Sequence, residues 1–198
     1  MTGSIATGKS TVSAYLKHSG VPLIDLDEIV HTLQQPNTET MAALVQAFGS
    51  EILTDQATLN RHHLGSLIFN DDQAREKLNK TMRPFIVTAL REQLSAYQMN
   101  HAPLVVLDIP LLFELGYEWW CDQTLVVSVP EPIQIQRLMT RDHLTQTEAE
   151  QRIASQWPQK DKMARATHCI DNSESLMNTY QQVDEWLLDL PVSHLENS

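Results

Sequence analysis

The chain has 198 residues, 42% of them hydrophobic and 20% charged, so it can bury the core of one compact domain and is of ordinary globular composition. Its 25 acidic and 14 basic side chains give a formal net charge of −11, which argues against a general nucleic-acid binder, because such proteins need basic surface to neutralise phosphates. Two cysteines imply no disulfide framework and fit a reducing cytoplasm, and no apolar run reaches the ~20 residues of a membrane span.

The apolar residues predict helices and strands in alternation along the chain. In the first half of the chain we expect a helix at 9–18, a buried strand at 21–26, a helix at 28–34 and a helix that is capped by Asn37 and ends at Gly49. Residues 61–98 are expected to form helical segments with breaks at 70–72 and at Pro84. In the second half we expect strands at 104–109, 124–129 and 167–171, and helices at 132–141, at 145–156 (starting on a capping box) and at about 173–188. Because strands alternate with helices, an α/β fold with a mainly parallel sheet covered on both faces is expected, with 61–98 as a helical insert.

The chain opens on a glycine-rich loop, GSIATGKS, at residues 3–10. Gly3, Gly8, Lys9 and Ser10 match the pattern G-x-x-x-x-G-K-[ST], and a helix follows as the pattern requires. Glycines let the backbone curl so that several N–H groups point into one cavity, and the helix adds its positive end. We therefore expect a nucleotide phosphate on this loop, with Lys9 reaching the β- and γ-phosphates and the Ser10 hydroxyl binding Mg²⁺.

A strand normally precedes such a loop, and we expect it to be missing from this sequence. This strand would be central in the sheet, and its loss would leave two neighbouring strands without hydrogen-bond partners. The sequence therefore predicts either that the native protein begins upstream of Met1 or that the core of the chain as given is unstable.

Three aspartates stand where strands are expected to end. Asp108 closes the run LVVLD, so its carboxylate is expected to face the phosphates and hold the metal directly or through water, although it could merely begin a turn before Pro110. Asp25 and Asp27 would share one face of a strand. One of them could hold a metal-bound water and the other could accept a proton from a substrate hydroxyl, whereas the alternative is that Asp27 caps the helix at 28–34.

Three arginines follow in the C-terminal part of the chain. Arg137 and Arg141 are four residues apart and share one helical face, and Arg152 lies in the next helix. Such arginines can compensate the charge of a phosphoryl group in transfer. Taken alone, a solvent-exposed face is the usual position of surface arginines and is the favoured interpretation.

The remaining motifs narrow the class of phosphate-loop protein. A switch GTPase needs a base-reading N/T-K-x-D and a D-x-x-G, and neither is present, because Ile-Pro-Leu follows Asp108. A motor or transporter ATPase would normally be larger. What remains is a small kinase with a helical insert for its acceptor and an arginine-bearing lid that excludes water from ATP.

Several segments resemble bacterial dephospho-CoA kinase. They are, in order, TGSIATGKSTV, VPLIDLD, LNRHHLGSLIF, LDIPLLFELG, CDQTLVV, QIQRLMTRD, RIASQ and IDNS. The resemblance runs from residue 2 to about 173 and implies transfer of the ATP γ-phosphoryl group to the ribose 3′-hydroxyl of dephospho-CoA, giving coenzyme A and ADP. It also implies a P-loop kinase three-layer sandwich, with a nucleotide-binding core at 1–55 and 101–198, a helical CoA-binding lobe at 56–100 and a lid at 137–158.

The resemblance also implies roles for single residues. The expected ATP-binding residues are Gly3, Ser4, Ile5, Ala6, Thr7, Gly8, Lys9, Ser10 and Thr11, with Arg137 from the lid and Asn172 beside the adenine. The expected catalytic residues are Lys9, Asp27 as the base for the 3′-hydroxyl, and the lid arginine Arg141. The expected acceptor-side residues are Asp25, Arg61, Leu64, Phe69, Arg83, Leu111, Leu112, Phe113 and Glu114. Ser10 and Asp108 are the expected Mg²⁺ residues.

The sequence departs from the family pattern at Arg83-Pro84, where the family usually has His-Pro. An arginine can still bind a phosphate or pyrophosphate, so binding is expected to survive with altered affinity. Two other functions stay open: another small-molecule or nucleoside kinase, and a catalytically silent nucleotide-binding regulator. The expected partners are small molecules, ATP with Mg²⁺ and an acceptor, and neither nucleic acid nor a membrane.

Overall fold

The computed structural model describes residues 1–69 and 71–190. The chain divides into two compact units: Met1–Ile24 together with the chain from His101 onward, here called the sheet unit, and Asp25–Asn100, here called the helical unit. The helical unit thus holds the predicted lobe at 56–100 together with the helices that precede it.

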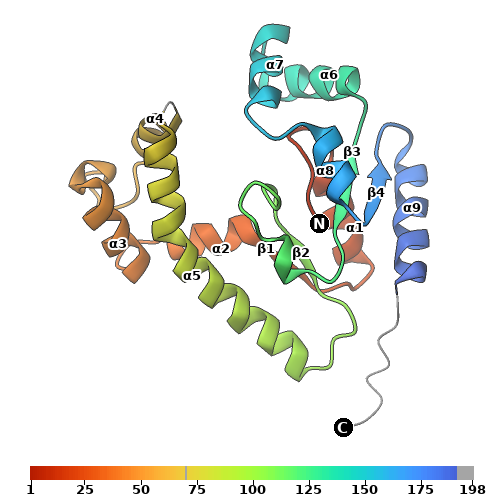
Figure 1. Cartoon of the computed structure of the whole chain (residues 1–198), viewed down its shortest axis with the longest axis horizontal. Helices are drawn as coiled ribbons and strands as arrows, with labels where there is room; N and C mark the ends of the chain where they lie inside the picture. The colour runs from red at the N-terminus through yellow and green to blue at the C-terminus, as the bar shows by residue number, and fades with distance from the viewer. Residues whose placement is uncertain (70, 191–198) are drawn as a thin grey trace. The chain divides into compact units, whose positions relative to one another are not determined.

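The sheet unit consists of short strands connected by helices (Figure 1). Its elements are α1 (Lys9–His18), β1 (Leu23–Asp25, whose last residue is at the unit boundary), β2 (Val106–Asp108), the 3₁₀ helix η2 (Glu118–Trp120), β3 (Leu125–Ser128), α6 (Glu131–Asp142), α7 (Gln146–Ala154), α8 (Gln159–Arg165), β4 (His168–Asp171) and α9 (Leu176–Asp189). β1 pairs with β2, and β3 pairs with β4 in parallel, with Leu125 opposite His168. The predicted α/β class and parallel pairing are therefore confirmed.

The first two residues occupy the place of the strand that we expected to be missing. The Thr2 N–H donates to a β3 carbonyl at 2.8 Å, and the Thr2 carbonyl accepts from a β3 N–H at 2.9 Å. On the other side, the Met1 carbonyl accepts from the Ile109 N–H at 3.0 Å, and the Met1 ammonium donates to the Leu107 carbonyl at 2.6 Å. Burial lowers the pKa of this ammonium. Where Met1 and Thr2 lie between them, β3 and the end of β2 therefore have the hydrogen-bond partners that we expected them to lack.

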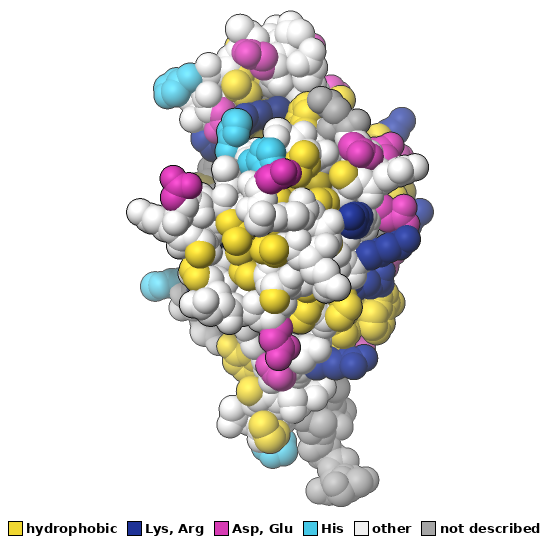
Figure 2. All heavy atoms as spheres, turned by 90° about the vertical axis from the view of Figure 1, so that its left-hand side faces the viewer, with side chains coloured by type: hydrophobic (Ala, Val, Ile, Leu, Met, Phe, Trp, Pro, Cys, Tyr) yellow, Lys and Arg dark blue, Asp and Glu magenta, His cyan; other side chains and the backbone are white. Residues whose placement is uncertain are grey.

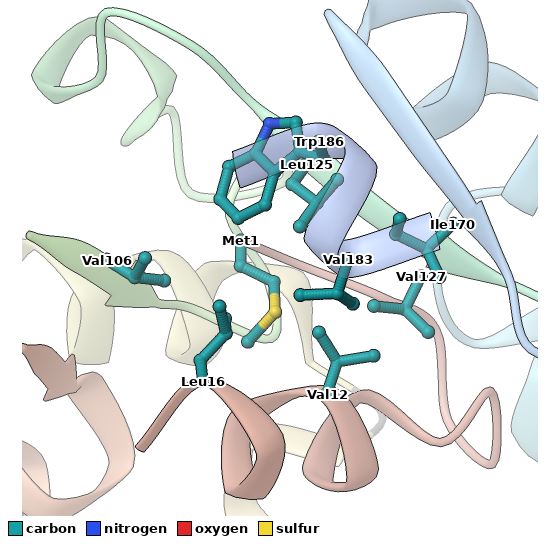
Figure 3. Packing of buried hydrophobic residues seen from close by; sticks show 9 residues of the cluster. All are labelled: Met1, Val12, Leu16, Val106, Leu125, Val127, Ile170, Val183 and Trp186. Carbon is teal, nitrogen blue, oxygen red and sulfur yellow. The ribbon is translucent and has the colours of Figure 1, made fainter. Parts of the chain in front are cut away.

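The core of the sheet unit lies between its strands and the helices α1 and α9 (Figure 3). It contains Met1, Val12, Leu16, Val106, Leu125, Val127, Ile170, Val183 and Trp186. Leu125 and Val127 point into this cluster from β3, and Val126 between them is fully buried although its side chain points to the opposite face. Both faces of β3 are therefore covered, and α8 also contacts this strand.

The helical unit consists of α2 (Leu26–Leu33), α3 (Glu39–Phe48), the 3₁₀ helix η1 (Ser50–Ile52), α4 (Arg61–Phe69) and α5 (Asp72–Met99). The long helix α5 contacts α2, α3 and α4. The predicted break at Pro84 is wrong, because α5 continues through this residue (Figure 1). Buried Met82, Ile86 and Leu90 on both sides of Pro84 pack α5 into its unit, and this packing compensates for the lost backbone hydrogen bond. In the other predicted break, residue 70 lies outside the described residues.

Local hydrogen bonds shift several predicted boundaries. The strand predicted at 21–26 is shorter, because the Asp25 side chain accepts from two backbone N–H groups and so begins α2 at Leu26. Thr38, and not Asn37, caps α3, with its hydroxyl accepting from the Met41 N–H at 3.1 Å. The predicted capping box of Thr145 and Glu148 is present at the start of α7. Helix α8 was not predicted, because seven residues are too few to show a helical repeat.

Charged and apolar side chains are mixed on the surface. On the face in Figure 2, acidic side chains are scattered, and many of the basic ones gather along one side of the view. Among the described residues, no helix combines the length and the hydropathy needed to cross a membrane.

Candidate phosphate-binding site

The loop at residues 3–10 curls tightly between Thr2 and α1. The Ser4 carbonyl accepts hydrogen bonds from both the hydroxyl and the N–H of Thr7, at 2.9 and 3.2 Å. Ala6 and Gly8 adopt left-handed backbone conformations, with φ of 62° and 85°. Gly8 occupies the N-cap position of α1 and has no side chain with which to cap the helix. The N–H groups at this end of α1 are therefore suited to an anion.

Two glycines of the loop sit where a side chain would collide with its surroundings. A Cβ at Gly3 would lie 2.7 Å from the Thr7 hydroxyl and 2.9 Å from the Val127 carbonyl oxygen. A Cβ at Gly8 would lie 2.0 Å from the Asn172 side-chain nitrogen. The loop therefore needs glycine at both positions because of close packing, and at Gly8 also because of the positive φ.

We expect Gly8→Ala to weaken ADP and ATP binding at least ~10-fold, because the added Cβ must displace Asn172 from the loop. The matched control is Gly20→Ala, which has a similar φ of 79° but no atom within 4 Å of the added Cβ. The control therefore bears only the left-handed strain and should keep its nucleotide affinity. Isothermal titration with both nucleotides measures the difference, and equal losses in both variants would contradict the explanation from packing.

Lys9 and Asp108 form an ion pair beside the loop. The Lys9 Nζ lies 2.5 Å from Asp108 Oδ1, and the Ser13 hydroxyl donates to Asp108 Oδ2 at 2.6 Å. Asp108 is 2% exposed, whereas the Lys9 side chain keeps 19% of its surface accessible. Asp108 therefore holds the Lys9 ammonium at the loop. Both Asp108 oxygens are engaged in this way, so its role as a metal ligand stays a prediction; Ser10 is exposed in the first turn of α1.

Asn172 is hydrogen-bonded both to Arg137 and to the phosphate loop. The Asn172 side-chain nitrogen donates to the Thr7 carbonyl at 2.9 Å, and its oxygen accepts from the Thr179 hydroxyl at 2.8 Å. Arg137 donates to the Asn172 carbonyl at 2.9 Å. The amide of Asn172, predicted beside the adenine, is thus hydrogen-bonded to the phosphate loop itself. No feature of the sequence near Asn172 indicated this contact.

Arg141 and Arg152, in contrast, share a carboxylate on the surface. Arg141 donates to both oxygens of Asp142, at 2.8 and 3.1 Å, and Arg152 lies 2.6 Å from one of them. The hydrogen bond from Arg141 lowers the pKa of Asp142, and the same bond raises the pKa of Arg141. In this arrangement Arg137 donates to Asn172, which is itself hydrogen-bonded to the loop, whereas Arg141 is held by Asp142.

A buried ion pair connects the segment after β2, residues 111–114, to α8. Lys162 is fully buried, and its Nζ lies 2.6 Å from Glu114 Oε1, which also accepts from the Trp157 N–H at 3.3 Å. The preceding Leu112 and Phe113 are buried in the core, at 0% and 4% exposed, while Leu111 is half-buried. Of the predicted acceptor-side residues in this segment, three therefore already have packing or ion-pair partners in the sheet unit. The burial of Lys162 was not predicted, because the preceding residues 159–161 are all polar and give no sign of it.

Glu114→Gln should lower the free energy of unfolding by about 3–5 kcal/mol, because it leaves the buried Lys162 ammonium without its countercharge. Adding Lys162→Met should restore most of this stability, since the double variant buries no charge. Urea denaturation of the single and double variants provides the measurement. A loss below about 1 kcal/mol in the single variant, as for exposed pairs, would contradict the expectation.

In the helical unit, Asp25 and Asp27 do not share a strand. Asp25 is the N-cap of α2, accepting from the N–H groups of Asp27 and Glu28 at 2.9 and 3.3 Å. The prediction that both carboxylates lie on one strand face is therefore wrong, and the capping role considered for Asp27 belongs to Asp25. Asp27 itself lies in the exposed first turn of α2.

The other predicted acceptor residues of the helical unit lie on α4 and α5. Arg61 begins α4 and is exposed, Leu64 is buried, and Phe69 is 75% exposed at the end of this helix. Arg83 is exposed on α5. The roles of these residues stay predictions.

Comparison with known proteins places the chain in a family. The family model described as dephospho-CoA kinase matches residues 1–178. The chain belongs to the dephospho-CoA kinase family. A curated dephospho-CoA kinase of Enterococcus faecalis is 46% identical over 187 residues, which cover 94% of each chain. One of Arabidopsis thaliana is 36% identical over 198 residues, covering 99% of this chain and 85% of the relative. The resemblance drawn from the sequence is thereby confirmed.

Solved structures agree with this membership. A Thermus thermophilus protein superposes with a TM-score of 0.83 at 34% identity, covering 96% of this chain and 95% of that one. The dephospho-CoA kinase of Campylobacter jejuni superposes with a TM-score of 0.70 at 26% identity, covering 95% and 94%. A shikimate kinase of Bacteroides thetaiotaomicron, with a TM-score of 0.52 at 17% identity over 96% of each chain, shares the fold alone. The predicted P-loop kinase fold is therefore confirmed.

Proposed function

We propose that this member of the dephospho-CoA kinase family transfers the γ-phosphoryl group of ATP to the ribose 3′-hydroxyl of dephospho-CoA, giving coenzyme A and ADP. The observation that carries the proposal is the loop at residues 3–10, curled at the start of α1 with the Lys9 ammonium held beside it. Family membership over residues 1–178 supports the choice of acceptor.

The loop from Gly3 to Thr11 binds the ATP phosphates in this proposal. Its curled backbone and the start of α1 offer N–H groups and the positive end of the helix dipole. Lys9 adds a positive charge at the β- and γ-phosphates, and its partial exposure in the pair with Asp108 leaves the ammonium accessible to them. Arg137 and Asn172 complete the ATP-binding site in this proposal. Arg137 is hydrogen-bonded to Asn172, and the Asn172 side chain is hydrogen-bonded to the loop.

Mg²⁺ fits the exposed hydroxyl of Ser10, because this ion uses few protein ligands and takes the remaining oxygens from phosphates and water. Asp108 fits less well as a direct ligand while Lys9 and Ser13 occupy its oxygens, and a water-mediated contact suits it better. When bound, the ion neutralises charge on the β- and γ-phosphates.

On the acceptor side, Asp27 accepts the proton of the 3′-hydroxyl, and Asp25 orders the first turn of α2 that carries Asp27. Arg141, with Arg137, compensates the charge of the phosphoryl group in transfer, which requires Arg141 to exchange its bonds to Asp142 for the phosphates. The acceptor itself is bound by Arg61, Leu64, Phe69 and Arg83 of the predicted lobe 56–100 and by the segment Leu111 to Glu114. The segment 137–158 acts as the lid.

The reducing cytoplasm suits the chain, since both of its cysteines, Cys121 and Cys169, are free thiols. Burial raises the pKa of both thiols, Cys121 and Cys169, so neither is activated as a thiolate.

The test is ADP release from Mg-ATP with dephospho-CoA as acceptor, beside adenosine and pantetheine as competing acceptors. Turnover selective for dephospho-CoA is expected. Faster turnover with adenosine would favour a nucleoside kinase instead. ATP binding without transfer to any acceptor would favour a silent nucleotide-binding regulator.

A further inference from the structure

Two glutamine side chains form hydrogen bonds to the backbone of Ile5 in the phosphate loop. The Ile5 N–H donates to Gln156 Oε1 at 2.8 Å, and the Ile5 carbonyl accepts from Gln134 Nε2 at 2.7 Å. A backbone N–H can only donate and a carbonyl can only accept, so these bonds fix which amide atom of each glutamine faces the loop. Gln134 lies on α6 and is 2% exposed, and Gln156 follows α7 and is half-buried.

Ile5 directly precedes Ala6, whose backbone conformation is unusual. With φ of 62°, Ala6 is a non-glycine residue in the left-handed region, which its Cβ disfavours. The Ile5 carbonyl belongs to the peptide group that joins Ile5 to Ala6, so the bond from Gln134 holds the plane on which this φ depends. A disfavoured conformation of this kind persists only where its surroundings enforce it.

We propose that Gln134 and Gln156 are positioning residues, which hold the phosphate loop in its nucleotide-binding shape through Ile5 and link it to α6 and α7. Arg137 lies on the same helix as Gln134, so the linkage also sets the spacing between the loop and this arginine. The proposal rests on the proposed function in one respect, namely that this loop binds the ATP phosphates. The bond from the buried Gln134 is the stronger constraint, because water cannot replace it.

Two substitutions remove the two bonds. Gln134→Met and Gln156→Met keep the length of the side chain but provide no amide. Each should weaken Mg-ATP and ADP binding ~10-fold, the effect of losing a hydrogen bond to a buried backbone group, and leave dephospho-CoA binding within ~2-fold. Gln136→Met is the matched control, because Gln136 is an exposed glutamine two residues from Gln134 on the same helix. It should leave all three affinities unchanged.

A second-site change separates positioning from a general loss of structure. Ala6→Gly relieves the left-handed backbone, so in the Gln134→Met background it should recover a large part of the lost ATP affinity, ~3-fold or more. Ala6→Gly alone is measured beside the double variant, so that the recovery is judged against the same loop substitution. Loss of packing around a buried glutamine would not be repaired at Ala6. If Gln134→Met fails to fold, the half-buried Gln156→Met decides the question.

Isothermal titration of the full chain with Mg-ATP, ADP and dephospho-CoA gives these affinities, with melting temperature as the check on folding. Unchanged ATP affinity in a folded Gln156→Met variant overturns the proposal, and so does an equal loss for dephospho-CoA. Lys9→Met, measured in parallel, distinguishes failure of the proposed function. If Lys9→Met also keeps full ATP affinity, the loop does not hold the phosphates and both proposals fail. If only Lys9→Met loses affinity, the loop binds ATP and the glutamines do not position it.

Discussion

Lys9→Met should reduce turnover of ATP with dephospho-CoA by at least ~10²–10³-fold, the effect of removing one preorganised group that stabilises charge in the transition state. The structure holds the Lys9 ammonium at the phosphate loop, 2.5 Å from Asp108. Methionine is one atom shorter than lysine but keeps most of its apolar stem, and it removes the charge and the hydrogen bonds. Steady-state ADP release is the measurement, and turnover within tenfold of the unsubstituted chain would contradict this role.

The same substitution should also cost stability, which a control can separate from catalysis. Without Lys9, the buried Asp108 carboxylate keeps the hydrogen bond from Ser13 but loses its countercharge. We expect a loss of about 3 kcal/mol, at the lower end for buried pairs because the Lys9 side chain is partly exposed. Adding Asp108→Asn should recover stability and leave turnover as low as in Lys9→Met alone. If the double variant regained turnover, the loss in Lys9→Met would be a folding defect.

Asp27→Asn should reduce turnover at least ~100-fold while ATP affinity is retained, since general base catalysis contributes a factor of this size. Asparagine preserves the size of the side chain and cannot accept the proton of the 3′-hydroxyl. Asp27 lies in the exposed first turn of α2, where an asparagine of the same size can be accommodated, so the variant should keep the fold. Rates at saturating dephospho-CoA and Mg-ATP give the comparison.

Glu28→Gln is the matched control for Asp27, because it removes the neighbouring negative charge from the same helical turn. A change in the interaction with the α2 dipole would affect both variants alike, by a few tenths to ~1 kcal/mol in stability. A specific loss in Asp27→Asn therefore indicates proton transfer. Unchanged turnover in Asp27→Asn would remove this residue from the role of base.

Much of the backbone could be predicted from short stretches of sequence. The loop pattern with α1 behind it and the capping box of α7 are local, because each depends on residues within one or two turns of each other. The order of strands and helices likewise indicated a parallel α/β sheet. The prediction failed where distant packing outweighed a local preference, as at Pro84 inside α5, whose neighbours are buried against other helices.

The sequence by itself determined the family, the class of fold and the loop that marks the candidate site. Only the tertiary structure decided what surrounds that loop. Gln134, Gln156 and Asn172 are more than a hundred residues from the loop, and they reach it because parallel strands bring the ends of successive connections to one edge of a sheet. The sequence places all three in segments that resemble the family, but it does not indicate which atoms of the loop they bond, because these partners depend on the packing of whole elements. The pairing of Met1 and Thr2 with both neighbouring strands was hidden for the same reason.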